Sequence, residues 1–215
     1  MNLGLVRGKT CVIIINKMFK RICKITFITH GATVYSLDGI VNDTLKYPKL
    51  NEFGEDEIKK VCEYLEKRGV AYDKIYTSPN ACCTQTAQII AKLFKQKAVP
   101  VDITQRNHGV WHGSFYADLF KEKGSTVLTQ TPENGESLND FNKRISKAID
   151  KLIKENKGNR IIVVTTPEVV QAAIAKTLEL KPENQHRTLI KTGSLTQISY
   201  FEGWSSLIYS DYSPL

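Results

Sequence analysis

The sequence predicts an α/β protein, a three-layer α/β/α sandwich with a mostly parallel sheet. Short runs of apolar and β-branched residues alternate along the chain with longer segments in which apolar residues recur at helical spacing. One run, residues 160–164, is nearly all apolar, as in a strand that a parallel sheet buries on both faces. Ligands bind such sheets at the carboxyl ends of the strands, so we expect the functional site there.

The elements of the first half follow from local patterns. In order, we expect a strand at 24–29, a helix from 54 to 69, a strand at 74–77, a helix opened by Ser78-Pro79 and an extended stretch at 99–103. The strands are short β-rich runs, and the helices repeat apolar residues three or four positions apart. The first strand ends at His30-Gly31, where glycine permits a sharp turn, so His30 should enter a loop.

The second half of the chain opens with a loop-rich stretch at residues 106–136, in which Trp111 is expected in the core and His108 and His112 near the pocket mouth. The elements expected after it are a helix capped by Ser137 with Phe141 in the core, a strand at 160–164, a helix begun by Thr166-Pro167-Glu168, and closing strands at 194–201 and 204–209. We find no repeat or linker, so these elements should form one domain.

Positive charge is concentrated near the start of the chain. The 215 residues carry a formal net charge of +8, and residues 1–24 hold six basic side chains and no acidic one, which leaves +2 for the remainder. A nearly neutral body speaks against nucleic acid as a partner. The sequence is therefore divided into a basic N-terminal extension, residues 1–23, and a domain, residues 24–215.

The extension has an apolar run, residues 11–15, that is too short for a secretory signal core or a membrane span. Two interpretations stay open: a flexible segment, including one upstream of a true start at Met18, and an organelle-targeting peptide. The five cysteines are scattered and lack the spacing of a zinc knuckle or redox dithiol. We therefore expect a cytoplasmic protein without a membrane span, a metal or a cofactor.

Six short motifs occur in order along the domain. They are Thr29-His30-Gly31-Ala32-Thr33, residues 50–54, residues 78–87, Gln105 with Gly109, Trp111 and Gly113, residues 132–137, and residues 163–167. In this order and at these separations they resemble the motifs of the histidine phosphatase superfamily, the phosphoglycerate-mutase-like proteins, over about residues 24–209. The short stretch between Gly113 and Pro132 is similar to that of the compact phosphatases in the superfamily.

The resemblance implies a role for each site residue. In the family, a histidine attacks phosphorus and becomes phosphohistidine, two arginines and a second histidine hold the phosphoryl oxygens, and a carboxylic acid protonates the leaving group. The nucleophile corresponds to His30, within His30-Gly31. The positions of the two arginines, the second histidine and the acid hold Thr29, Cys82, Thr166 and Gln105, and Ser36 replaces an asparagine that often follows the first motif.

Four vacated roles weigh against phosphatase activity. Two lost arginine contacts at about 1.5–3 kcal/mol each would weaken phosphate binding by roughly 10²–10⁴-fold. Glutamine cannot deliver a proton, and general acid catalysis typically contributes about 10²–10⁴-fold. The leading hypothesis is a pseudophosphatase that retains only the histidine at the nucleophile position. Its partner would be a small phosphorylated or uncharged metabolite, or another protein.

Three alternatives stay open. An active phosphomonoesterase could act through a phosphohistidine at His30 if another cation, such as Arg106 or Lys191, served the pocket. The inherited geometry would also place the Cys82 thiol near His30, which permits Cys/His chemistry. The purely structural interpretation makes His30 inert, Cys82 and Cys83 packing residues and Thr166 a helix cap.

Overall fold

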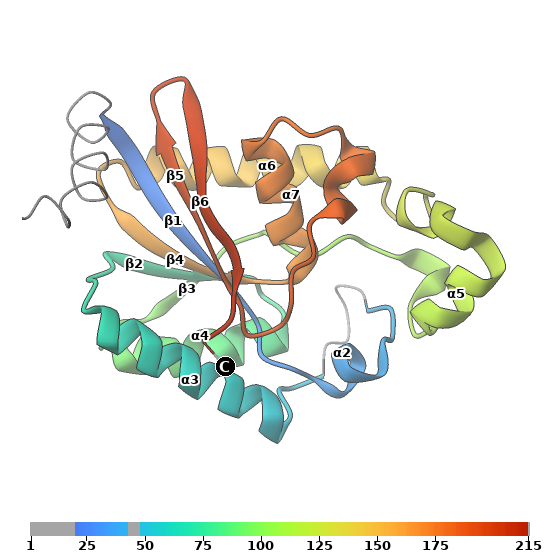
Figure 1. Ribbon diagram of the computed structural model, residues 1–215, viewed down its shortest axis with the longest axis horizontal. Helices are drawn as coiled ribbons and strands as arrows, with labels where there is room; N and C mark the ends of the chain where they lie inside the picture. Colours follow the sequence, from blue (N-terminus) through green and yellow to red (C-terminus); the bar gives the residue numbers. More distant parts are fainter. Residues whose placement is uncertain (1–19, 43–47, 215) are drawn as a thin grey trace, which may run out of the picture.

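The computed structural model describes residues 20–42 and 48–214, in which a six-stranded sheet lies between two layers of helices (Figure 1). The strands are β1 (Arg21–Thr29), β2 (Lys74–Thr77), β3 (Ala98–Pro100), β4 (Arg160–Thr165), β5 (Leu195–Phe201) and β6 (Trp204–Tyr212). Their order is β3-β2-β4-β1-β5-β6. The first four run parallel, and β5 and β6 pair antiparallel at one side. The predicted sandwich and its mostly parallel sheet are confirmed.

Two helix pairs cover the two faces of the sheet. The α-helices are α2 (Val34–Asp38), α3 (Glu52–Arg68), α4 (Ala81–Leu93), α5 (Tyr116–Lys123), α6 (Leu138–Glu155) and α7 (Pro167–Thr177). Figure 1 shows α3 and α4 on one face and α6 and α7 on the other. No helix of the described ranges is long and apolar enough to cross a bilayer.

Side chains of the central strands point alternately to the two faces of the sheet and contribute to a hydrophobic core on each face. In β1, Phe27 packs toward α6 and α7, whereas the next residue, Ile28, packs toward α3 and α4. The same alternation places Ile161 of β4 in the first core and Ile162 in the second. Successive side chains of a strand point to opposite faces, so a run that is apolar throughout fits a sheet covered on both sides. Phe141 of α6 is fully buried, as predicted.

Local signals set the ends of several helices. The Asn51 carboxamide accepts a hydrogen bond from the Gly54 amide (2.8 Å), so α3 begins at Glu52, two residues before the predicted start. The Ser137 hydroxyl accepts from the Asp140 amide (3.0 Å) and caps α6 as predicted. Thr166 occupies the N-cap position of α7 as predicted, but its side chain makes no capping hydrogen bond.

Short elements account for most other differences from the sequence prediction. The stretch 106–136 contains α5 and two 3₁₀ helices, packed around a small cluster that includes Trp111, which is buried as predicted. Helix α2 spans five residues and is held by a reciprocal pair of hydrogen bonds between Thr33 and Ser36. Strand β1 starts at Arg21, three residues before the predicted start. Residues 1–19 of the predicted extension lie outside the described ranges.

Candidate active site

A cavity of about 190 Å³ opens at the carboxyl ends of β1 and β4. His30 directly follows β1 and Thr166 directly follows β4, and the last residues of these parallel neighbours, Thr29 and Thr165, are paired in register. The two side chains therefore enter the same crevice. Further walls come from α2, from residues 105–108, from Tyr116 and from the first residues of α7. The cavity lies where the sequence predicted a site.

The structure brings together part of the predicted set. His30, Ser36, Gln105 and Thr166 line the cavity. Thr29 does not, because its hydroxyl donates to the backbone carbonyl of Lys191 (2.7 Å) on the β1–β5 side. Gly31 allows two chain segments to pack closely, because a Cβ at this position would lie 2.2 Å from the Gly54 carbonyl oxygen.

The His30 ring is held in one orientation by the backbone of the next residue. Its Nδ1 lies 2.8 Å from the carbonyl oxygen of Gly31, and the side chain is 6% exposed. A carbonyl can only accept a hydrogen bond, so Nδ1 carries the proton and Nε2 is the nitrogen that could attack an electrophile. The backbone beyond this turn is fixed by the Glu57 carboxylate, which accepts from the Ala32 amide (2.7 Å).

The His30 ring also lies close to the Cys82 thiol at the start of α4, where Cys83 is the next residue. The hydrogen bond from Cys83 and the nearby imidazole lower the pKa of Cys82 against the opposing effect of burial. Burial keeps Cys83 a thiol by raising its pKa. Although burial alone would lower the pKa of His30, the charge and hydrogen bond of Cys82 raise it. The contact with Cys82 therefore favours the protonated form of His30.

Cys82 itself is 0% exposed and does not line the cavity. It packs with Cys83, Ala87 and Ile90 in the core beneath the site. The predicted proximity of Cys82 to His30 is therefore present, but the sulfur is shielded from anything that enters the cavity. The thiol can therefore influence a ligand in the cavity only through its effect on His30.

The two cations proposed from the sequence as substitutes face elsewhere. The Arg106 guanidinium donates to the backbone carbonyls of Gln130 (2.7 Å) and Glu136 (2.8 Å). The Lys191 ammonium lies 3.6 Å from the Asp211 carboxylate on β6. Within residues 20–42 and 48–214, neither these nor any other arginine or lysine lines the cavity.

The cavity instead contains a carboxylate that the motifs had not singled out. Glu168, in the first turn of α7, pairs with His108 Nε2 at 3.2 Å, and both residues line the cavity. Burial would raise the pKa of Glu168, but His108 and then Arg106 outweigh it and lower that pKa. Glu168 is therefore ionised at neutral pH. The sequence showed Glu168 only as an acid suited to a helix start, and His108 only as a residue near the pocket mouth.

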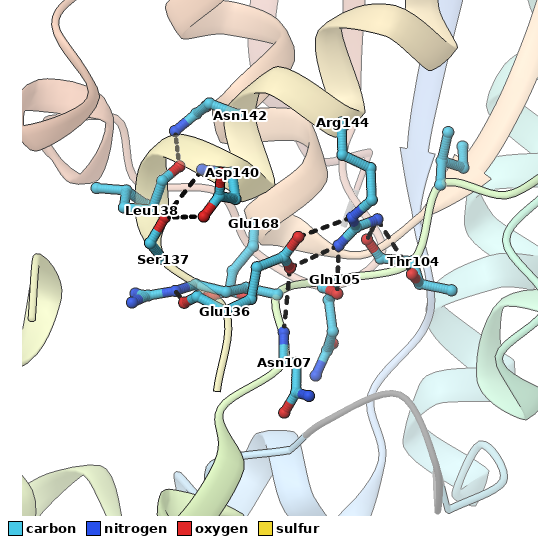
Figure 2. Close-up of polar contacts among 12 residues, drawn as sticks. Thr104, Gln105, Asn107, Glu136, Ser137, Leu138, Asp140, Asn142, Arg144 and Glu168 are labelled. Carbon is cyan, nitrogen blue, oxygen red and sulfur yellow. Dashed lines mark hydrogen bonds and ion pairs between the residues drawn. The ribbon is translucent and has the colours of Figure 1, made fainter. Parts of the chain in front are cut away.

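Gln105, at the position of the family's acid, is fixed from both sides. Its side-chain amide donates to the Asn42 carbonyl. Figure 2 shows Arg144 of α6 bridging Glu136 and the backbone at 104–105. Arg144 donates to both carboxylate oxygens of Glu136 (2.9 and 2.8 Å) and to the carbonyls of Thr104 and Gln105 (2.9 and 3.1 Å). The hydrogen bonds from Gln105 to Asn42 and from Arg144 to the Gln105 backbone thus fix the orientation of the glutamine.

No group of three or more histidine, cysteine or acidic side chains in the described part of the chain is arranged to hold a metal ion. The chemistry available at the site therefore consists of one buried imidazole, a histidine–carboxylate pair and several hydroxyl and amide groups. These groups can accept and donate hydrogen bonds, and Glu168 adds a carboxylate to them.

The fold and the histidine at the end of β1 define a protein of the phosphoglycerate-mutase-like α/β class. The chain belongs to the histidine phosphatase superfamily (branch 1), whose sequence profile matches residues 25–209. This membership confirms the family that the six motifs indicated.

Named relatives agree with this family. A broad-specificity phosphatase of Saccharomyces cerevisiae is 25% identical over 185 residues, covering 83% of this chain and 80% of the relative. A metal-independent phosphoserine phosphatase of Arabidopsis thaliana is 29% identical over 168 residues, covering 73% and 69%. The structure of an Entamoeba histolytica phosphoserine phosphatase in complex with 3-phosphoglyceric acid superposes with a TM-score of 0.77 at 21% identity, covering 89% of this chain and 98% of that one. This last likeness shows the fold.

Proposed function

We propose that this protein is a catalytically impaired member of the superfamily, a pseudophosphatase that uses the inherited cavity for binding. The observation that carries the proposal is the charge of the cavity. Glu168 contributes a carboxylate, and no arginine or lysine of the described residues faces it. A phosphomonoester brings about two negative charges of its own.

The magnitudes favour exclusion of phosphate. Two like unit charges about 6 Å apart repel by about 3 kcal/mol at an effective dielectric constant of about 20. His108 offsets part of the Glu168 charge through the contact at 3.2 Å. The arginine contacts that would supply attraction in the family are replaced by Thr29, which bonds to a backbone carbonyl, and by Cys82, which is buried. Ground-state binding and transition-state stabilisation should both be weak.

The state of His30 adds a second obstacle. An imidazolium has no lone pair with which to attack phosphorus, and the Cys82 contact raises the pKa of His30. Gln105, at the position of the acid, cannot protonate a leaving oxygen. Cys82 and Gln105 thus support a site in which neither the nucleophile nor the acid works as in the family.

Two of the relatives are named as phosphatases, so an active phosphomonoesterase is the competing function. Turnover of p-nitrophenyl phosphate by the full chain separates the two, with His30→Ala as the matched control. We expect the parent and His30→Ala to be indistinguishable. Activity in the parent that His30→Ala abolishes would overturn the proposal.

A gain-of-function variant sharpens this test. The double substitution Thr29→Arg with Cys82→Arg restores two family residues and removes the thiol beside His30. Because both positions are buried, circular dichroism must first show that the variant is folded. Recovery of phosphate binding by the folded variant would support loss of function through these positions.

A further inference from the structure

The cavity walls carry polar atoms without a partner in the described parts of the chain. The Thr166 hydroxyl and His108 Nδ1 are both in this state, although the residues are only 1% and 4% exposed. The side-chain oxygen of Asn42 is a third such atom. Buried polar groups are paired in the great majority of cases, and each unpaired one costs about 1–3 kcal/mol. Three of them around one cavity point to a bound molecule that pairs them.

The chemistry of these atoms defines the molecule. The Asn42 oxygen only accepts hydrogen bonds, whereas His108 Nδ1 accepts in the neutral ring and donates in the protonated ring. The Glu168 carboxylate adds negative charge with a fifth of its side chain exposed. The Thr166 hydroxyl accepts or donates. Asn42 and Glu168 thus offer acceptors to a ligand that carries hydrogen-bond donors.

We propose that the cavity binds a small, phosphate-free metabolite with an ammonium group and a hydroxyl group, an amino alcohol in chemical class. The ammonium would lie against Glu168 and Asn42, and the hydroxyl would pair with Thr166 and His108. The volume of about 190 Å³ suits a ligand of a few heavy atoms. This inference rests on the proposed function, because an active phosphatase would need the opposite charge in the same place.

A matched pair of probes tests the proposal on the full chain. Ethanolamine and O-phosphoethanolamine differ only in the phosphate, and their dissociation constants can be measured by ¹H–¹⁵N NMR titration. We expect ethanolamine to bind more tightly, with shift changes at Asn42, His108 and Thr166. Tighter binding of O-phosphoethanolamine, or no binding of ethanolamine, would overturn the assignment.

Two near-isosteric variants locate the binding. Glu168→Gln removes the charge and should weaken ethanolamine binding roughly 10- to 100-fold, as expected for a hydrogen bond to a charged group. Thr166→Val removes the hydroxyl and should weaken binding roughly 2- to 10-fold. Glu183→Gln, at an exposed position outside the cavity, is the control and should leave binding unchanged. Equal affinity in Glu168→Gln and the parent would contradict the proposed ligand position.

The failures of the two proposals are distinguishable. Turnover of p-nitrophenyl phosphate through His30 refutes the impaired enzyme whatever the NMR titration shows. Absence of both turnover and ethanolamine binding refutes only the amino alcohol and leaves the pseudophosphatase standing.

Discussion

The His30 ring lies close enough to the Cys82 thiol for each to shift the pKa of the other, at the position where the family's motif carries an arginine. Burial is the largest influence on the pKa of His30 and lowers it, so the increase depends on Cys82. Replacing Cys82 by alanine should therefore lower the pKa of His30 from its value in the parent, while the Gly31 carbonyl and Glu57 still raise it. The titration can be followed by NMR of the imidazole ring.

The matched control for that titration is Cys62→Ala, which removes a half-buried thiol from α3, away from the cavity. It should leave the pKa of His30 unchanged. If both alanine variants gave the parental value, the thiol would not be what protonates His30.

Gly31 should tolerate no side chain. A Cβ there would lie 2.2 Å from the Gly54 carbonyl oxygen and 3.0 Å from Ile58, so Gly31→Ala must push apart β1 and α3. We expect a loss of about 1–3 kcal/mol in the free energy of unfolding, measured with urea. Gly203→Ala, at a turn with nothing within 4 Å but a φ of 80°, should lose about 1 kcal/mol. A smaller loss at Gly31 than at Gly203 would refute the close approach.

Arg144 should contribute more to the free energy of unfolding than a surface ion pair does. Its guanidinium spans Glu136 and two backbone carbonyls, and the side chains are 30% and 18% exposed. Arg144→Ala should cost about 2 kcal/mol of unfolding free energy. Lys151→Ala breaks a 3.9 Å pair with Glu155 that is 74% and 49% exposed, and should cost below about 0.5 kcal/mol. Similar losses in the two variants would show that the Arg144 framework contributes little.

Glu168 should make stability depend on acid pH. Its folded pKa is lowered below the ordinary 4.5, because His108 and Arg106 outweigh burial. A lowered acid pKa contributes stability that is fully present above the unfolded value and lost as the pH falls through the folded value. Urea unfolding from pH 7 to below pH 4.5 should therefore show a steeper loss in the parent than in Glu168→Gln. Parallel curves would indicate that Glu168 titrates as in the unfolded chain.

The part of the site that lies at the ends of parallel strands could be predicted from the sequence. His30 and Thr166 each follow a strand of a parallel sheet, so their meeting requires only that β1 and β4 be neighbours. Glu168 and His108 could not be paired in this way, because 60 residues separate them and His108 lies in a stretch of loops and short helices rather than at the end of a strand. Helix α5 escaped prediction because it spans only eight residues in a glycine-containing stretch.

The sequence motifs could not predict which way long side chains point in the folded protein. The sequence offered Arg106 and Lys191 as substitute cations, but backbone carbonyls engage the first and Asp211 engages the second. Long basic side chains have several rotatable bonds, so their destination depends on acceptors that only the folded structure assembles. The lack of an arginine or lysine among the described residues that line the cavity is therefore clearer in the structure than in the motif.

The presence or absence of phosphohistidine at His30 tests the impaired-enzyme proposal most directly. The full chain would be incubated with a phosphomonoester, and its peptides analysed by mass spectrometry under conditions that preserve the phosphorus–nitrogen bond, with His30→Ala alongside. We predict no phosphate on His30. Phosphorylation of His30 in the parent, absent from His30→Ala, would show that the nucleophile still works despite Cys82, Gln105 and Glu168.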